Sequence, residues 1–412
     1  MTQPNPPAPP TQHRNTHAVP TRFIAPDVAR GLMLLFIALA NVVTAWAPAQ
    51  EGMMAQSIGG VREDSLLDKI VVVFGAMFVH VRGLPMFATL LGFGVGMISL
   101  SLLRRGYPRP KAQAVLLRRY GWLMFFGAIH MVFLFFGDIM FTYGLCGLVL
   151  AGLIAVGNKH LKWIAGGLWI VGAIVTFLLN MAGTPLMEAA STYLGYLGYG
   201  AAMLLGMLFA SPLLLISLLP PMIVGLLMAR MLMLHDVPAH RRGLTIWAGI
   251  AVAFILLVGL PWGLAEIGVL PASWAPLLYA LNQAAGYLTG PGLVAAIALL
   301  VQPAQRRMNQ DGTMNPMMYA LVALGKRSMS GYVAQSVLFF PLVLPFTLHL
   351  AEGMGAAGKS LIAVGVWLLT LLAAVALERA GKPGPLESLH RRLSYGKEGL
   401  QKQWQPEPGR GE

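Results

Sequence analysis

Two ionisable side chains, His130 and Asp138, interrupt the apolar stretch FGAIHMVFLFFGDIMFTYGLCGL, residues 126–148. An ionised group at the centre of a bilayer costs about 2.5–3.5 kcal/mol on insertion scales, so such groups usually face a cavity or a partner. Histidine is the usual general base near neutral pH, and an aspartate before a helix can cap it. On one regular helix, eight residues separate two side chains by about 12 Å and about 80°. We therefore expect His130 and Asp138 to line separate walls of one outward-facing site without contacting each other.

A second polar set begins the first apolar run and consists of Asp27, Arg30 and Asn41. Asp27 and Arg30 are three residues apart, which allows an ion pair at the start of a helix. Arg30 and Asn41 lie about three helical turns apart, or about 16 Å, and so share one face. That face links the inner surface to the middle of the membrane. The alternative is a snorkelling arginine and an asparagine that packs helices together.

Two further stretches carry polar residues inside apolar sequence. His80 and Arg82 precede Pro85, and they are either functional or anchors at the membrane interface. The segment LGKRSMSGYVAQS, residues 324–336, contributes Arg327, Ser330, Tyr332 and Gln335. Such polar density predicts a lined cavity or hydrogen bonds between helices. The sequence contains no HExxH, cysteine–histidine cluster or paired acidic site, so we predict no metal centre.

The elements that must position these residues are membrane-spanning helices. Apolar residues make up 57% of the 412 and charged residues 11%, against about 25% charged in a soluble domain. The mean hydropathy is +0.67. The net charge of +13 comes mostly from short loops between apolar runs, a pattern typical of the cytoplasmic side of a membrane and not of nucleic-acid binding. The fold class predicted is an all-α polytopic membrane protein.

Runs of about 20 apolar residues predict about ten transmembrane helices with both termini in the cytoplasm. A single span in the long block 189–234 makes basic and acidic loops alternate, whereas two spans would reverse every later orientation. Two more helices, 70–81 and 193–202, are expected at the outer interface. The predicted spans are 31–46, 83–103, 120–136, 139–156, 163–181, 209–232, 245–264, 277–301, 330–350 and 361–377.

The chain divides into a transmembrane domain and two tails. Residues 1–21 are rich in proline and predict a disordered cytoplasmic tail. They lack the apolar core of a signal peptide, so the first apolar run is expected to remain as an anchor. Residues 22–380 form the transmembrane domain, and residues 381–412 form a basic cytoplasmic tail. We expect a multi-pass protein of the plasma (inner) membrane, for which a homodimer is one allowed assembly.

Five blocks, taken in order, resemble the YeiB-like membrane proteins, which carry domain of unknown function 418. They are RFIAPDVARG with Asn41, VRGLPMFATLLGFGVG, GAIHMVFLFFGDIMFTYGLCGL, LGKRSMSGYVAQS and GPLESLHRRLSYG. Together they span nearly the whole chain without the tails, with 200–396 as the family's conserved block. The family is similar to transmembrane acyltransferases. The resemblance implies that an acyl group passes from cytoplasmic acyl-CoA, first of all acetyl-CoA, to an outer small-molecule, glycan or lipid acceptor.

The resemblance also implies roles for individual residues. The acyltransferase-3 pattern has a histidine where this chain has Asn41, so the general base falls to His130 or His80, with Asp138 nearby. Asn41 would donate to the developing oxyanion. Asp27, Arg82, Ser330, Tyr332 and Gln335 would line the polar path. Guanidinium groups suit phosphate recognition, and those at the inner face belong to Arg30, Arg104, Arg105, Arg118, Arg119 and Arg327.

Two other classes of function fit the same residues. Intramembrane histidine, aspartate and arginine also form proton relays, so the chain could be a proton-coupled transporter or exporter. In a purely structural membrane protein, the polar groups would only pack helices. Binding of acyl-CoA at the inner face separates the first reading from the other two.

Overall fold

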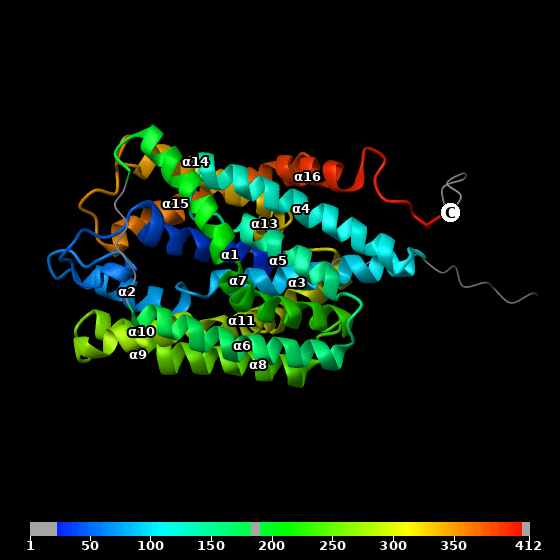
Figure 1. Cartoon of the computed structure of the whole chain (residues 1–412), viewed down its shortest axis with the longest axis horizontal. Helices are drawn as coiled ribbons and strands as arrows, with labels where there is room; N and C mark the ends of the chain where they lie inside the picture. The colour runs from blue at the N-terminus through cyan, green and yellow to red at the C-terminus, as the bar shows by residue number, and fades with distance from the viewer. Residues whose placement is uncertain (1–22, 183–189, 406–412) are drawn as a thin grey trace, which may run out of the picture.

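The computed structural model describes residues 23–182 and 190–405, so the predicted tail 1–21 lies outside the described residues. Within them the regular elements are helices, apart from one isolated bridge between Met54 and Val61. Figure 1 shows most of the long helices running side by side along one axis. The α-helices are α1 (Ala25–Asn41), α2 (Leu66–Phe78), α3 (Gly83–Arg104), α4 (Arg109–Phe133), α5 (Met140–Leu153), α6 (Asn158–Met181), α7 (Tyr193–Arg230), α8 (Arg241–Phe254), α9 (Leu260–Glu266), α10 (Ala275–Ala285), α11 (Thr289–Leu300), α12 (Gln302–Asp311), α13 (Pro316–Gly325), α14 (Ser328–Val343), α15 (Ala356–Arg379) and α16 (Pro385–Tyr395). Short 3-10 or π-helical segments are η1 (Val42–Trp46), η2 (Gln56–Ile58), η3 (Ile255–Gly259), η4 (Ala272–Trp274) and η5 (Gly286–Leu288).

Seven helical stretches in the described residues are long and apolar enough to cross a membrane. Three shorter apolar helices, α5, α13 and α14, accompany them. The all-α class predicted from the sequence is therefore confirmed, and the length and composition of these helices fit a multi-pass membrane protein. The seven stretches are Ala25–Trp46, Leu66–Arg104, Asn158–Met181, Tyr193–Arg230, Arg241–Glu266, Ala272–Leu300 and Ala356–Arg379.

The outward faces of these helices are apolar, as a lipid environment requires. On α2, Leu66, Ile70 and Phe74 recur every fourth residue and are more than 45% exposed. On α6, Ile170, Ile174 and Leu178 repeat the pattern. A spacing of four residues keeps side chains on one face of a helix. In water such stripes would be unfavourable, whereas in hydrocarbon they are the expected surface.

The break between α2 and α3 is held by Arg82. Its guanidinium donates to the carbonyls of Met77 and His80 at 3.0 Å, and to Asn282 Oδ1 at 2.8 Å. The last carbonyls of a helix have no partner within that helix. The fully buried arginine thus caps the end of α2. Its hydrogen bonds offset the free-energy cost of removing its charge from water. The sequence predicted this break at the same place.

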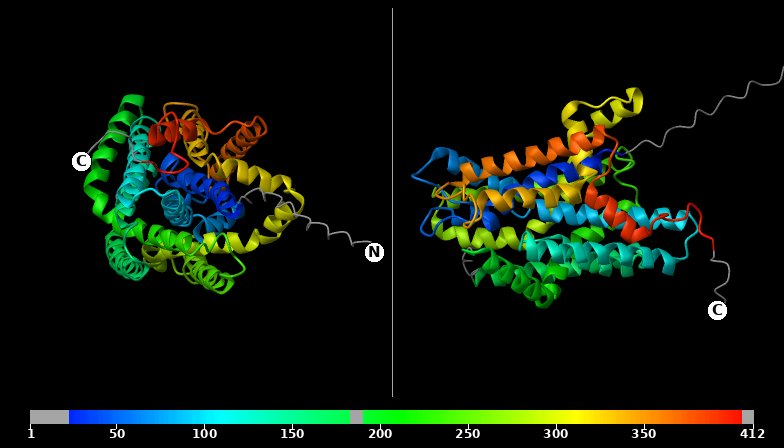
Figure 2. Two further views of the ribbon diagram at one scale, coloured as in Figure 1. Left: turned by 90° about the vertical axis from the view of Figure 1, so that its right-hand side faces the viewer. Right: turned by 90° about the horizontal axis from the view of Figure 1, so that it is seen from above.

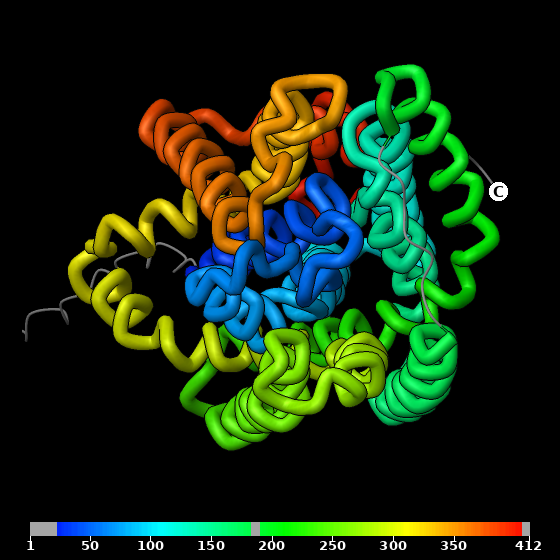
Figure 3. Tube along the Cα trace, turned by 90° about the vertical axis from the view of Figure 1, so that its left-hand side faces the viewer, coloured from blue at the N-terminus to red at the C-terminus, as the bar shows by residue number. Residues whose placement is uncertain are grey.

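The long block 189–234 contains one helix where two were predicted. Helix α7 is continuous over 38 residues, although Pro212, Pro220 and Pro221 lie inside it. The expected boundary between 202 and 209 is wrong, because the helix runs through that segment without a break. At 1.5 Å per residue α7 would be about 57 Å long, against about 30 Å for the hydrocarbon core. Figure 3 shows its first part (green) crossing the side of the bundle before it turns inward, and prolines commonly cause such bends.

Helices α4 and α5 form a close antiparallel hairpin. A Cβ atom on Gly127 would lie 2.0 Å from the backbone nitrogen of Phe141. A Cβ atom on Gly144 would lie 2.4 Å from the backbone nitrogen of Met124. The two glycines let the helix backbones approach, a common device in membrane helix packing. The hairpin therefore brings the start of α5 back against the second half of α4.

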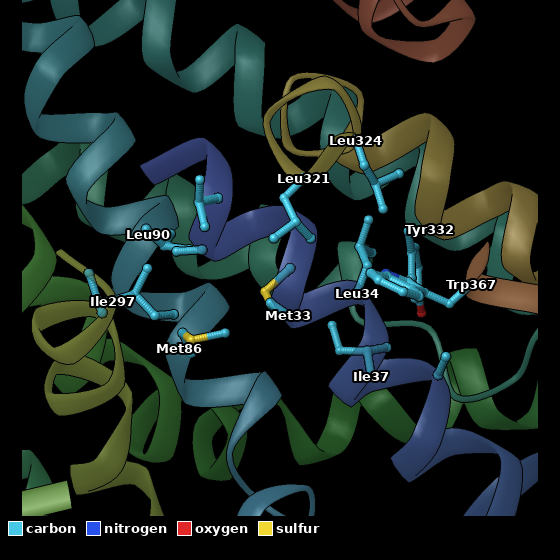
Figure 4. Close-up of a cluster of buried hydrophobic side chains, with 14 of the residues drawn as sticks. Met33, Leu34, Ile37, Met86, Leu90, Ile297, Leu321, Leu324, Tyr332 and Trp367 are labelled. Carbon is cyan, nitrogen blue, oxygen red and sulfur yellow. The ribbon is translucent and has the colours of Figure 1, made fainter. Parts of the chain in front are cut away.

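Helix α1 lies in the middle of the bundle (Figure 3). Its Met33 and Leu34 are almost fully buried in the main apolar cluster, which Figure 4 shows in close-up. That cluster joins α1 to α3, α11, α13, α14 and α15 through Met86, Leu90, Ile297, Leu321, Leu324, Tyr332 and Trp367. The core therefore fixes α14, and with it Tyr332, against the central helix. By contrast, Figure 2 shows α12 (yellow) lying away from the main body of the bundle.

Candidate functional site

His130 and Asp138 contact each other, contrary to the expectation from regular helix geometry. His130 Nδ1 lies 2.7 Å from Asp138 Oδ2, and both side chains are at most 3% exposed. The expectation failed because α4 ends at Phe133, three residues before the predicted end of the span. The chain then reverses before α5 begins at Met140, which returns Asp138 to the last turn of α4.

Asp138 also holds the start of α5. Its Oδ1 accepts a hydrogen bond from the backbone nitrogen of Phe141 at 2.7 Å, so the predicted capping interaction is present. One carboxylate oxygen is thus fixed by a helix start and the other faces the imidazole. When Asp138 is ionised, its carboxylate only accepts hydrogen bonds and His130 Nδ1 is the donor. This arrangement leaves His130 Nε2 with its lone pair, the form needed in a general base.

Tyr332 of α14 completes a buried polar group with His130 and Asp138, which we call the His130 site. The rings of His130 and Tyr332 have centroids 5.1 Å apart. Within the described residues, His130 Nε2 is buried without a hydrogen-bond partner, and the buried Tyr332 hydroxyl approaches only the backbone of Ile139. Buried polar atoms are nearly always satisfied, so such an exception asks for an explanation such as a bound molecule. One turn further along α14, Gln335 donates to the carbonyl of Leu34 at 3.3 Å and so serves packing.

A cavity of about 830 Å³ lies beside the His130 site, at the end of the bundle where η1, α9 and α10 meet. Its wall includes Trp46 and Phe136. The Trp46 ring stacks on Phe135 with centroids 4.6 Å apart, and Phe135 meets His130 edge-on at 6.2 Å. We call this space the outer cavity, because the topology expected from the sequence puts this end of the bundle outside. A single ring, that of Phe135, links its wall to the imidazole of His130.

Asn41 and His80 do not join the His130 site through any hydrogen bond among the described residues. Asn41 is half-buried at the end of α1, where the chain passes into η1 and toward the outer cavity. His80 is buried against Trp262 of α9, with ring centroids 5.7 Å apart. It belongs with Arg82 to the break between α2 and α3. His130 is therefore the histidine whose surroundings suit a base.

The arginines predicted to bind phosphate differ in how they are engaged. Arg30 pairs with Asp27 at 3.2 Å, as predicted. Arg119 donates to the hydroxyl of Tyr395 at 3.1 Å. Arg327 is 5% exposed and bonds Glu378 and the carbonyls of Ala323 and Lys382, which leaves its guanidinium saturated. Three of the set are exposed: Arg104 and Arg105 at the end of α3, and Arg118 in the first half of α4.

Ser330 contacts the tail helix α16 through Glu387, a residue that the sequence did not single out. The Glu387 carboxylate accepts hydrogen bonds from the backbone nitrogens of Met329 and Ser330, at 2.8 and 3.1 Å, and from the Ser330 hydroxyl. A carboxylate is favoured at a helix N-terminus, where unpaired N–H groups point outward. Nothing in the sequence set Glu387 apart from the other glutamates of the tail. This contact fixes α16 to the start of α14.

His390 provides a second attachment of α16. Its Nε2 lies 2.8 Å from the carbonyl oxygen of Arg119 in α4. Burial, followed by the nearby positive charge of Arg119, lowers the pKa of His390 to about 4. The imidazole is therefore neutral at ordinary pH and donates through Nε2.

These features define the class: an all-α, multi-pass membrane protein that encloses a histidine–aspartate pair among its helices. Residues 228–397 match the family model described as protein of unknown function (DUF418), so this part of the chain is a DUF418 family domain, as the sequence predicted. The matched region runs from the last residues of α7 through α16 and includes Tyr332. No curated protein matches the chain. Among the described residues, no group of three or more His, Cys, Asp or Glu could hold a metal ion.

Proposed function

We propose that the protein is a transmembrane acyltransferase, which passes an acyl group from cytoplasmic acyl-CoA to an acceptor on the outer side. The observation that carries the proposal is His130, whose Nδ1 faces a fixed carboxylate and whose Nε2 has no partner among the described residues. A carboxylate, an imidazole and an open second nitrogen form the arrangement that activates a nucleophile. The resemblance to transmembrane acyltransferases supports the same reaction.

The proposed topology has ten crossings, with Phe23 and Gln405, the ends of the described chain, on the cytoplasmic side. The positive-inside rule supports this arrangement, because basic residues follow every second crossing. The acidic residues Glu51, Glu266 and Glu352 then lie outside. The proposed crossings are α1, α2 with α3, α4, α5, α6, α7, α8 with α9, α10 with α11, α14 and α15.

In the proposed reaction, His130 Nε2 removes the proton from the acceptor hydroxyl or amine as that atom attacks the thioester carbon. The new bond to the acyl carbon forms, the carbon–sulfur bond breaks, and the proton passes from Nε2 to the departing thiolate. Asp138 keeps Nδ1 protonated and stabilises the imidazolium that forms in between. The Tyr332 hydroxyl is placed to donate to the oxyanion of the intermediate, a role that the sequence had offered to Asn41.

At the donor end, we assign the phosphates of acyl-CoA to the exposed arginines of the inner face, Arg104, Arg105 and Arg118. Arg30 and Arg119 border the same end of α1 and α4. Arg327 is a weaker candidate for phosphate binding, because Glu378 already neutralises it. Acetyl-CoA is the first donor to test.

A proton-coupled transporter or exporter is the second candidate, because a buried histidine–aspartate pair can also relay protons. The two candidates differ in what the pair acts on. A transferase needs acyl-CoA and releases a thiol, whereas a transporter needs a proton gradient.

The experiment that tests the proposal measures thiol release from acetyl-CoA by the purified full-length protein in lipid nanodiscs. We expect His130→Ala to lower turnover by about 10²-fold or more, the usual share of a general base. His160→Ala is the matched control, because His160 is exposed at the start of α6. Absence of both acyl-CoA binding and thiol release, together with proton-coupled flux in proteoliposomes, would replace acyl transfer by transport.

A further inference from the structure

The outer cavity has the size and the walls of a small-molecule site. Its volume of about 830 Å³ lies in the range of 300–1,000 Å³ that is usual for ligand pockets. Five aromatic rings, from η1, the turn after α4, α7 and α10, face it. They are Trp46, Phe136, Tyr196, Tyr199 and Tyr279. Such walls suit a ligand with an apolar or aromatic body.

The charge of this cavity is opposite to that of the whole chain. Its lining contains two carboxylates, Glu51 and Glu266, and no Lys, Arg or His among the described residues. The complete sequence has a net charge of +13. Two carboxylates in a concave wall repel anions and attract cations, because a cleft of low dielectric focuses the field of its charges.

Glu266 is held in place at the wall. Its Oε1 accepts hydrogen bonds from Ser57 Oγ and from Trp262 Nε1, both at 2.9 Å. Neither of these bonds uses Oε2. Trp262 is fully buried, and its ring packs edge-on against Tyr279 at 5.6 Å. The cavity thus presents a fixed carboxylate next to a tyrosine face, which together recognise a cation by charge and by its attraction to a π-system.

We infer that the outer cavity binds an organic cation, namely a primary amine on an apolar or aromatic body. The ammonium group lies at Glu266 and Tyr279, and the apolar body lies among the remaining rings. A neutral alcohol of the same shape keeps the stacking but loses the charge-assisted hydrogen bond. An anionic ligand meets two like charges.

The inference goes one step further if the proposed function holds, because the bound amine would then be the acyl acceptor. The ammonium first loses a proton to solvent. The amine nitrogen bonds to the acyl carbon as the carbon–sulfur bond breaks, and its second proton passes through His130 Nε2 to the thiolate. The products are an amide and free CoA. For this step the amine must leave Glu266 and turn toward His130, and the Phe135 ring, which stands between the cavity wall and His130, must move aside.

Calorimetric titration of the full-length protein in phosphatidylcholine nanodiscs tests the inference. The two probes are tyramine and its alcohol counterpart tyrosol, and empty nanodiscs correct for partition into lipid. We expect tyramine to bind at least about tenfold more tightly, since a hydrogen bond to a charged group is worth about that factor or more. Equal affinities for the two probes would overturn the inference without any variant.

Variants locate the site. Glu266→Gln keeps an oxygen for Ser57 and Trp262 but removes the charge, so we expect it to abolish most of the preference for tyramine. Glu352→Gln is the control, because Glu352 is exposed and does not line the cavity. Equal effects of the two substitutions would contradict the assignment to the outer cavity.

The same protein separates this inference from the proposed function. Binding of tyramine without formation of N-acetyltyramine from acetyl-CoA would leave the cation site in place and count against acyl transfer. Thiol release with no preference for the amine over the alcohol would support acyl transfer and overturn the cation site.

Discussion

At the scale of single residues, Asp138 combines two tasks that a substitution can separate. Its Oδ1 caps α5, and its Oδ2 faces His130. Asparagine is also a good capping residue, so it can hold the helix start. It cannot supply the negative charge that keeps His130 Nδ1 protonated and stabilises the imidazolium.

We predict that Asp138→Asn lowers acyl transfer by about 10²-fold or more while the fold survives, since a changed tautomer stops a histidine base. Asp138→Ala should lower turnover equally and also cost about 0.5–2 kcal/mol of stability through the lost cap. Thiol release and thermal unfolding, measured side by side, distinguish the two. Normal turnover in Asp138→Asn would show that the pair is structural.

The residue types of this site were predictable, but their contact was not. An imidazole and a carboxylate in an apolar run indicated a site, because placing ionisable groups at membrane depth is energetically unfavourable. Their contact depends on where α4 stops, and the sequence from Phe133 to Gly137 is nearly all aromatic and aliphatic, with no proline to mark a turn. For Arg82 the sequence allowed a polar cavity, and the structure instead uses it to satisfy the carbonyls of α2.

At the scale of elements, the tail helix α16 is attached at two points, to α14 through Glu387 and to α4 through His390. Both attachments lie at the end of the bundle that we assign to the cytoplasm, near Arg119. Each can be weakened alone, and the consequence is local because α16 is not a membrane span. Protease sensitivity of the tail is therefore the appropriate measurement.

We predict that Glu387→Gln makes the tail more sensitive to protease. The substitution removes the negative charge from the N-terminus of α14, a contribution of about 0.3–1 kcal/mol at accessible sites. The exposed Glu398 provides the control, and Glu398→Gln should leave cleavage unchanged. If both variants are cleaved like the natural protein, the carboxylate does not hold α16.

The attachment through His390 should weaken in acid. Burial and Arg119 lower the pKa of His390 to about 4 when docked, against 6.5 when free. Above pH 6.5 both states are neutral and docking is fully stable. Below it the free tail takes up a proton that the docked tail does not, so docking loses up to about 1.4 kcal/mol per pH unit down to about pH 4.

Limited proteolysis at pH 7.5 and pH 5.5 measures this effect. Cleavage of the tail should rise at the lower pH in the natural protein. His390→Gln keeps a hydrogen-bond donor for the Arg119 carbonyl but does not titrate in this range, so its cleavage should change much less. An equal acid response in both would assign the effect to another group.

Helices of ordinary length were predictable from run length, whereas unusual ones were not. The break between α2 and α3 and the long helices α6 and α15 follow directly from apolar runs and their polar ends. Helix α7 was divided wrongly, because sequence patterns do not show that a helix leaves the bundle axis. Helix α13 was missed, although Gly325 lets it approach α1 so closely that a Cβ atom would lie 1.9 Å from the Asp27 carbonyl oxygen.

At the scale of the whole molecule, the two ends of the bundle differ in chemistry. The end with Glu51 and Glu266 holds the outer cavity, and the other end carries the exposed arginines of α3 and α4. This polarity matches a donor with phosphates on one side and a cationic acceptor on the other. The difference between the two ends has functional meaning only if the end with the outer cavity faces outward. That orientation requires the long helix α7 to cross the membrane once.

The lone cysteine makes this orientation testable. Cys146 is fully buried, so the natural protein should react little with thiol reagents that do not cross membranes. Single cysteines can then be placed at exposed positions of each end, with Glu352→Cys at the cavity end and Lys111→Cys at the arginine end. We predict that Glu352→Cys reacts in intact cells, whereas Lys111→Cys reacts only after permeabilisation. If α7 crossed twice, Glu352→Cys would be protected while Lys111→Cys stayed inside, because Lys111 precedes α7 and Glu352 follows it. Reaction of Lys111→Cys alone in intact cells would show that the whole bundle has the opposite orientation.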